Sequence, residues 1–167
     1  MRFLFLCLLF SPLSVAALTT DAEQPLFLES ETLEYNEVLG TITYSGDVLM
    51  QQGSMKIRAD QVVIHGHIDR ATKVIAKGSP AHFQQTPEIN AVPVTAEAMR
   101  LEYEVKTKSL FLQGDASLHQ EGTSLSGNTI EYDVKNSIVK AGSTIDGSST
   151  KKRVKMVIPP KLLDSDN

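Results

Sequence analysis

The stretch TITYSGDVLMQQ, residues 41–52, returns 68 positions later as SLFLQGDASLHQ, residues 109–120. In both copies apolar and polar residues alternate on either side of a Gly-Asp pair, Gly46-Asp47 in the first copy and Gly114-Asp115 in the second. An alternation with a period of two indicates a β-strand with one buried face. A Gly-Asp pair between apolar residues favours a tight turn or a β-bulge. The two copies therefore predict β-structure with an internal repeat.

The repeat extends to both sides of this stretch. Further matched pairs share their apolar or polar character: Leu33 with Leu101, Tyr35 with Tyr103, Ile57 with Leu125, Val62 with Ile130, Ile64 with Tyr132, and Asp60 with Asn128. Each half is then a similar unit of several strands that covers its apolar face by stacking on its neighbour. We expect two β-layered halves in one continuous, elongated sandwich.

Residues 95–108 are the one segment with good helix formers, yet Met99, Leu101, Tyr103 and Val105 alternate with charged residues. This period favours a strand over a helix, so the chain is predicted to be all-β. Pro80, Pro87 and Pro93 indicate a longer connection between the halves.

The N-terminus has the pattern of a secretory signal. Arg2 precedes an unbroken apolar run over residues 3–10, which Ser11-Pro12 ends, and the following residues 14–17, SVAA, offer small residues for a signal peptidase. This pattern predicts a cleavable signal peptide over residues 1–17 and export, with cleavage after Ala16 or Ala17. We expect one β-domain over residues 18–160 and a polar tail over residues 161–167.

Charge and cysteine content exclude several classes of protein. The chain of 167 residues carries 16 basic and 20 acidic residues, a net charge of −4, which does not fit a nucleic-acid-binding protein. The only cysteine, Cys7, lies in the signal segment, so the exported domain has no disulfide and depends on strand pairing and apolar packing. No apolar run is long enough to span a membrane.

A metal site is the strongest enzymatic alternative. His65 and His67 have the spacing that places two imidazoles on one face of a strand, and Asp69 and His82 could complete the site. The carboxylate expected a few residues further on in a metal-binding jelly roll is replaced by Arg70 and Ala71. We predict no metal and no cofactor.

Other catalytic patterns are incomplete. Residues 122–126, GTSLS, lack the second glycine of a nucleophile elbow. Glu97, Glu102 and Glu104 lie at alternating positions typical of a solvated face. No catalytic residue is predicted, although a metal-dependent jelly-roll enzyme and a structural or adhesive β-domain stay open as alternatives.

Aromatic bulk is scarce for the core of a sandwich. Phe27, Phe83 and Phe111 are the only phenylalanines after the signal segment. Two facing sheets enclose a layer about 10 Å thick. A thinly filled layer could take up acyl chains, since each buried methylene contributes about 0.8 kcal/mol without directional contacts. The alternative is an ordinary close-packed core, which is the more common outcome for such a composition.

Several segments, in this order, resemble one family. They are QPLFLES (24–30), TYSGDV (43–48) with the following QG (52–53), IRADQV (57–62), GSPAHF (78–83), and KRV (152–154) with IPP (158–160). They resemble the OstA-like family of periplasmic lipopolysaccharide-transport proteins, and the resemblance covers nearly all of the chain after the signal segment.

This resemblance implies an antiparallel β-jelly-roll shaped as an open, slightly twisted groove that stacks end to end with like domains. It implies a periplasmic carrier that bridges the inner and outer membranes, with the acyl chains of lipopolysaccharide inside the groove and the sugars outside. The implied protein partners are inner-membrane LptC-like and outer-membrane LptD-like domains, together with further copies of this chain.

The apolar positions of the repeat and of the resemblance are the predicted groove lining, and the alternative for many of them is an ordinary place in the core. These positions are Leu26, Leu28, Ile42, Tyr44, Val48, Met50, Ile57, Phe83, Leu101, Leu110, Leu112, Leu118, Leu125, Ile130 and Tyr132. The resemblance supports Leu26, Leu28 and Phe83, and the repeat supports the others.

Partners are expected at the two ends of the sheet, because an unpaired edge strand is a template for another strand. The predicted edge residues are Pro25 and Phe27 in the first strand and Val154, Met156 and Ile158 in the last. A basic cluster of Lys151, Lys152, Arg153 and Lys155 could meet lipid phosphates or protect the edge.

Overall fold

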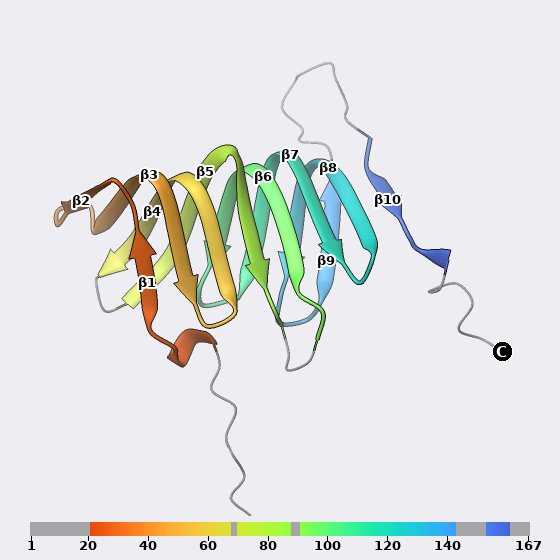
Figure 1. Ribbon diagram of the computed structural model, residues 1–167, viewed down its shortest axis with the longest axis horizontal. Helices are drawn as coiled ribbons and strands as arrows, with labels where there is room; N and C mark the ends of the chain where they lie inside the picture. Colours follow the sequence, from red (N-terminus) through yellow and green to blue (C-terminus); the bar gives the residue numbers. More distant parts are fainter. Residues whose placement is uncertain (1–20, 68–69, 88–90, 143–152, 161–167) are drawn as a thin grey trace, which may run out of the picture.

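The computed structural model describes residues 21–67, 70–87, 91–142 and 153–160 (Figure 1). The elements in chain order are η1 (Asp21–Glu23), β1 (Leu26–Glu29), β2 (Thr32–Asn36), β3 (Thr41–Gln52), β4 (Met55–His67), β5 (Arg70–Gln85), β6 (Val94–Glu104), β7 (Ser109–Gln120), β8 (Thr123–Asp133), β9 (Ile138–Gly142) and β10 (Lys155–Val157). Within these ranges, no helix is long and apolar enough to cross a membrane. The predicted signal peptide lies outside the described residues.

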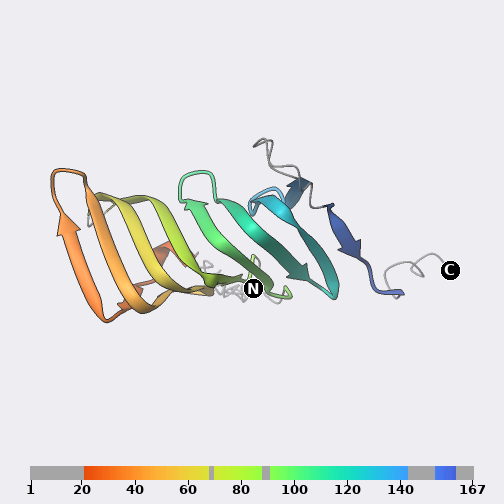
Figure 2. The same ribbon diagram turned by 90° about the horizontal axis from the view of Figure 1, so that it is seen from above.

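All ten strands belong to one antiparallel sheet. Its order is β1-β3-β4-β5-β6-β7-β8-β10, with β2 also paired to β3 and β9 also paired to β8. The strands run across the long axis of the molecule and succeed one another along it, from β1 and β2 at one end to β9 and β10 at the other (Figures 1 and 2). The predicted all-β, elongated and open antiparallel architecture is confirmed.

A line of register shifts crosses the sheet and folds it into two layers. The shifts lie between these pairs of residues: Ser45 and Val48, Arg58 and Gln61, Lys77 and Ala81, Glu97 and Arg100, and Gln113 and Ala116. A bulge bends its strand and increases the local twist, so each long strand contributes to both layers. We call this line the crease.

The Gly-Asp pairs lie on the crease. Gly46 and Asp47 have φ angles of 85° and 42°, and Gly114 and Asp115 have 79° and 49°. The structure thus selects the bulge from the two predicted alternatives. Pro80 lies within β5 at its register shift rather than in the connection between the halves, since a proline is tolerated where the pairing is interrupted.

The internal repeat is present at the level of strands. Both ends of β7 lie 68 residues after those of β3, and β8 begins 68 residues after β4. β6 is a strand, as its alternation predicts. The halves are joined by the pairing of β5 with β6, so they succeed one another along the long axis, and both contribute to both layers.

The core lies between the layers and is narrowest at the crease. Ala59, Ala76, Ala81, Ala98 and Ala116 flank the register shifts and are at most 9% exposed. Small side chains there allow the layers to approach closely, whereas the buried aromatic residues Phe83, Tyr103 and Tyr132 lie two to three residues beyond the shifts along their strands. The layers therefore converge at the crease.

Candidate functional site

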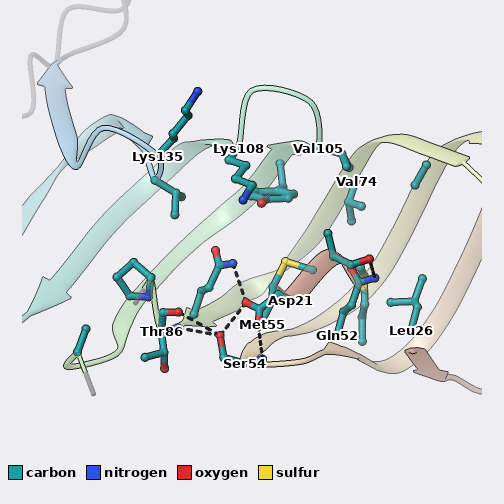
Figure 3. Close-up of a pocket in the computed structure, with 18 of the residues that line it drawn as sticks. Asp21, Leu26, Gln52, Ser54, Met55, Val74, Thr86, Val105, Lys108 and Lys135 are labelled. Carbon is teal, nitrogen blue, oxygen red and sulfur yellow. Dashed lines mark hydrogen bonds between the residues drawn. The ribbon is translucent and has the colours of Figure 1, made fainter. Parts of the chain in front are cut away.

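A cavity of about 950 Å³ opens between the strand ends that lie away from the crease (Figure 3). One wall comes from the β3–β4 hairpin and the end of β5, and it includes Met50, Met55 and Gln85. The other wall comes from the β4–β5, β6–β7 and β8–β9 ends, and it includes Ile64 and Val105. The cavity is the mouth of a groove that follows the long axis.

Apolar side chains contribute the larger share of the cavity surface, and polar and charged side chains contribute the rest. Beyond Met50, Met55, Ile64 and Val105, the apolar lining includes Leu26, Val74 and Val134. Ligand pockets are typically about 300–1,000 Å³ and mostly apolar, with a few placed polar groups. The size and lining of this groove suit flexible hydrocarbon chains, which gain free energy from burial without needing directional contacts.

A polar cluster centred on Asp21 forms the rim of one wall. Asp21 Oδ1 accepts a hydrogen bond from Ser54 N at 2.8 Å, and Oδ2 accepts from Ser54 Oγ at 2.7 Å and from Gln85 Nε2 at 2.9 Å (Figure 3). Burial raises the pKa of the Asp21 carboxyl, but these hydrogen bonds and the charge of Lys108 outweigh it and hold the pKa below its usual value. The hydrogen bonds of the cluster therefore hold a charged carboxylate at the mouth of the groove.

The same cluster joins the N-terminal segment to two distant elements. Gln52 Nε2 donates to Gln24 O at 3.1 Å, and Thr86 N donates to Ser54 Oγ at 3.1 Å. Strand β1 then continues from this segment and pairs with β3. Residues that are far apart in the sequence thereby form one rim of the groove.

The facing rim is basic. Arg70, Lys108 and Lys135 come from three successive ends of the second wall and line the cavity. Lys108 is directed toward the wall that carries Asp21, whereas Lys135 is directed away from the cavity (Figure 3). Burial, and then the Asp21 charge, raise the pKa of Tyr103, which is 7% exposed on the second wall.

The predicted groove residues are divided between the cavity and the core. Leu26 and Met50 line the cavity. Leu28, Tyr44 and Leu125 are half-buried against the core. The remaining predicted residues are buried: Ile42, Val48, Ile57, Phe83, Leu101, Leu110, Leu112, Leu118, Ile130 and Tyr132. Their inward orientation follows the alternation, and their contact with lipid stays a prediction.

The sequence interpretation omitted much of the mouth. Met55, Ile64 and Val74 line the cavity but were not among the predicted lining residues. Met55 lies two residues before the predicted lining residue Ile57 and therefore on the same face of the strand. This spacing is the signal that could have identified Met55. The polar residues Gln85 and Lys108 lie near strand ends, where alternation alone does not indicate which side chains face the cavity.

Strands β1 and β10 lie at opposite ends of the sheet. The predicted edge residues Phe27, Val154, Met156 and Ile158 are 65%, 44%, 59% and 43% exposed, and Pro25 is also exposed. Their role in partner binding stays a prediction. In the basic cluster, Arg153 and Lys155 are exposed, and Lys151 and Lys152 lie outside the described residues.

The alternative metal site is only partly within the described residues. His82 Nδ1 lies 3.2 Å from Glu97 Oε1, and the side chain of His67 and Asp69 lie outside the description. Among the residues that are described, no group of three His, Cys, Asp or Glu side chains could hold a metal ion.

Glu102 and Glu104 of β6 are ion-paired. Lys73 Nζ lies 2.7 Å from Glu102 and 2.9 Å from Glu104, and Arg100 lies 2.7 Å from Glu102. The Lys73 hydrogen bond is the main cause that lowers the pKa of Glu102. A carboxyl held charged in this way is suited to joining strands on the surface rather than to donating a proton.

Comparisons with known proteins agree with this architecture. A family model described as the LptA/(LptD N-terminal domain) LPS transport protein matches residues 28–138. The lipopolysaccharide export system protein LptH of Pseudomonas aeruginosa is 32% identical over 151 residues, which are 87% of this chain and 85% of that protein. LptA of Escherichia coli K12, also named a lipopolysaccharide export system protein, is 30% identical over 162 residues, which are 96% of this chain and 85% of that protein.

The fold is also that of a solved relative. The crystal structure of Pseudomonas aeruginosa LptH, described as the LptA-homologous periplasmic component of the conserved lipopolysaccharide transport device, superposes with a TM-score of 0.78 at 30% identity. The match covers 85% of this chain and 100% of that one. The chain therefore belongs to the LptA/LptD N-terminal-domain family of lipopolysaccharide transport proteins.

Proposed function

We propose that this protein is a periplasmic carrier that holds lipopolysaccharide by its acyl chains in the groove and passes it from the inner toward the outer membrane. The apolar cavity between the layers is the observation that carries this proposal. It offers space for chains between two walls, and its open mouth leaves a polar headgroup in water. The identity of the cargo, lipopolysaccharide, is inferred from the names of the relatives.

The ends of the sheet support assembly into a longer groove. β1 is antiparallel to β3, β10 is antiparallel to β8, and successive strands from β3 to β8 alternate in direction. Placing β10 of one copy beside β1 of the next therefore continues an antiparallel sheet. The same alternation holds for β9 beside β2 in the other layer.

We assign Pro25, Phe27, Val154, Met156 and Ile158 to these junctions. A second copy of this chain, an LptC-like domain or an LptD-like domain could each provide the matching edge. The backbone groups of an edge strand provide the affinity in such a junction, and exposed side chains provide the specificity.

Photo-crosslinking in cells tests the carrier. A photoreactive residue at Leu26, which lines the cavity and is 40% exposed, should give an adduct with lipopolysaccharide. The matched control is the neighbouring Phe27, which is not part of the lining and should give adducts with protein partners only. Equal lipid adducts at both positions, or none at Leu26 in a folded and exported protein, would contradict the proposal.

A further inference from the structure

The middle of the groove mouth carries an amide oxygen and an ammonium group for which the described residues supply no hydrogen-bond or ion-pair partner. The amide nitrogen of the same side chain, Gln85, is in use: it donates to Asp21, and a hydrogen bond from the Gln85 side chain lowers the pKa of Tyr103. Gln85, at the end of β5, is 8% exposed, and its Oε1 accepts no hydrogen bond from these residues. Lys108, on the facing wall, takes part in none of the ion pairs found among them. Both residues line the cavity.

The orientation of the Gln85 amide is determined by its neighbour. Gln85 Nε2 donates to Asp21 Oδ2 at 2.9 Å. A carboxylate can only accept hydrogen bonds, so the amide nitrogen must face Asp21 and the oxygen must face elsewhere. A buried acceptor without a donor costs about 1–3 kcal/mol. Gln85 Oε1 is therefore available for an N–H or O–H group of a ligand.

The repeat shows that Lys108 is not needed for the turn in which it lies. Its counterpart in the first half is Gly40. Gly40 has a φ of 58° and accepts a hydrogen bond from Gly66 N at 2.9 Å, while Lys108 has a φ of 54° and accepts from Val134 N at 3.0 Å. The backbone is the same, and glycine adopts this left-handed conformation with less strain than lysine.

A lysine at a position suited to glycine is a reason to look for a role of its side chain. The ammonium group is directed toward the Asp21 wall (Figure 3), and its charge contributes to the lowered pKa of Asp21. Asp21 already has three hydrogen bonds from Ser54 and Gln85. Lys108 can therefore bind a second anion without disrupting that cluster.

We propose that Gln85 and Lys108 form a headgroup-docking site across the middle of the groove mouth. Lys108 binds a phosphate of the lipid headgroup, and Gln85 Oε1 accepts from an N–H or O–H group where the acyl chains join the headgroup. The chains then extend into the apolar interior past Ile64 and Val74. This inference rests on the proposed carrier function. It adds that the lipid headgroup is held at one defined position along the groove.

The test compares two lipids and matched variants of the purified protein. The probes are bisphosphorylated lipid A and the same lipid with its phosphates removed. Lys108→Met should weaken binding of the phosphorylated lipid about tenfold, the loss expected for a charge-assisted hydrogen bond, and leave binding of the dephosphorylated lipid unchanged. Lys106→Met, in the same turn but outside the lining, is the control and should bind both lipids like wild type.

The second arm concerns Gln85. Gln85→Met should weaken binding of both lipids several-fold, because the donor at the chain junction is common to both. Gln84→Met, one residue away on the exposed face of β5, is the control. Asp21→Ala removes the hydrogen bonds that hold the N-terminal segment to Ser54 and Gln85 but keeps Gln85 Oε1. If this variant loses as much affinity as Gln85→Met, Gln85 acts through Asp21 and its assignment to the lipid is wrong.

The outcomes separate this inference from the carrier function. Wild-type protein that binds neither lipid contradicts the carrier itself. Wild-type protein that binds both, with Lys108→Met indistinguishable from Lys106→Met, contradicts the docking site alone. Displacement of phosphorylated lipid A by millimolar inorganic phosphate would show a site for free phosphate rather than for a lipid headgroup, and would also overturn the proposal.

Discussion

At the scale of single residues, Asp21 connects an N-terminal turn with two strand ends. Its contribution to the free energy of unfolding depends on the charge of its carboxylate. The lowered pKa means that the folded chain binds fewer protons at this carboxyl than the unfolded chain, whose value is near 3.8. The stability that Asp21 contributes is therefore complete above that value and is lost as the pH falls through the lower folded pKa.

This sign gives a measurable prediction. The difference in the free energy of unfolding between wild type and Asp21→Asn should be constant from pH 7 to about 5 and should shrink toward pH 3. Urea denaturation at each pH measures it. Glu29→Gln, an exposed position on β1, serves as the control. A difference that grows as the pH falls would contradict the assignment of the charge.

The Gly-Asp bulge is the second feature at this scale. Gly46 has a φ of 85°, and the side chain of Glu31 lies where a Cβ would be placed. Gly46→Ala should lower the free energy of unfolding by about 1–3 kcal/mol because of the strained backbone. Gly142→Ala is the matched control, since the nearest atom to its Cβ position, Thr129 Oγ1, is 3.8 Å away. An equal loss in both variants would show that the bulge is not the cause.

At the scale of elements, alternation predicted most of the strands, and its inward face is the buried one. Leu110, Leu112 and Leu118 in β7 are all buried. Alternation could not show the crease, because a register shift depends on which residues of two strands pair. Nor could it show the Asp21–Gln85 contact, which joins residues 64 positions apart.

The edge strands give the prediction that belongs to this scale. Phe27→Lys on β1 or Met156→Lys on β10 should abolish concentration-dependent association, because each places a charge at a proposed junction. Phe111→Lys is the control, since Phe111 is 40% exposed but lies on the central strand β7. Sedimentation equilibrium measures association. If Phe111→Lys dissociates the protein equally, association depends on exposed apolar surface in general and not on the edge strands.

At the scale of the whole molecule, a single folded sheet explains why the groove is open on one side. Each long strand from β3 to β8 passes through both layers, so the crease is closed by the covalent chain and buried alanines. The opposite side consists of strand ends, and no strand joins the walls there among the described residues. The scarcity of aromatic residues in the sequence left an unfilled layer and an ordinary packed core as alternatives, and the location of the cavity required the fold.

An open groove can be filled without disturbing the core, which gives the last prediction. Ala71 lines the cavity and is half-buried where the core meets the cavity, so a tryptophan there would occupy cavity space at the margin of the core rather than in its interior. Ala71→Trp should reduce the amount of a fluorescent fatty acid that the protein binds, while the thermal unfolding midpoint stays within a few degrees of wild type. Thr72→Trp, on the exposed face one residue away, should bind as wild type does. Unchanged binding by a folded Ala71→Trp variant would mean that acyl chains do not occupy this part of the groove.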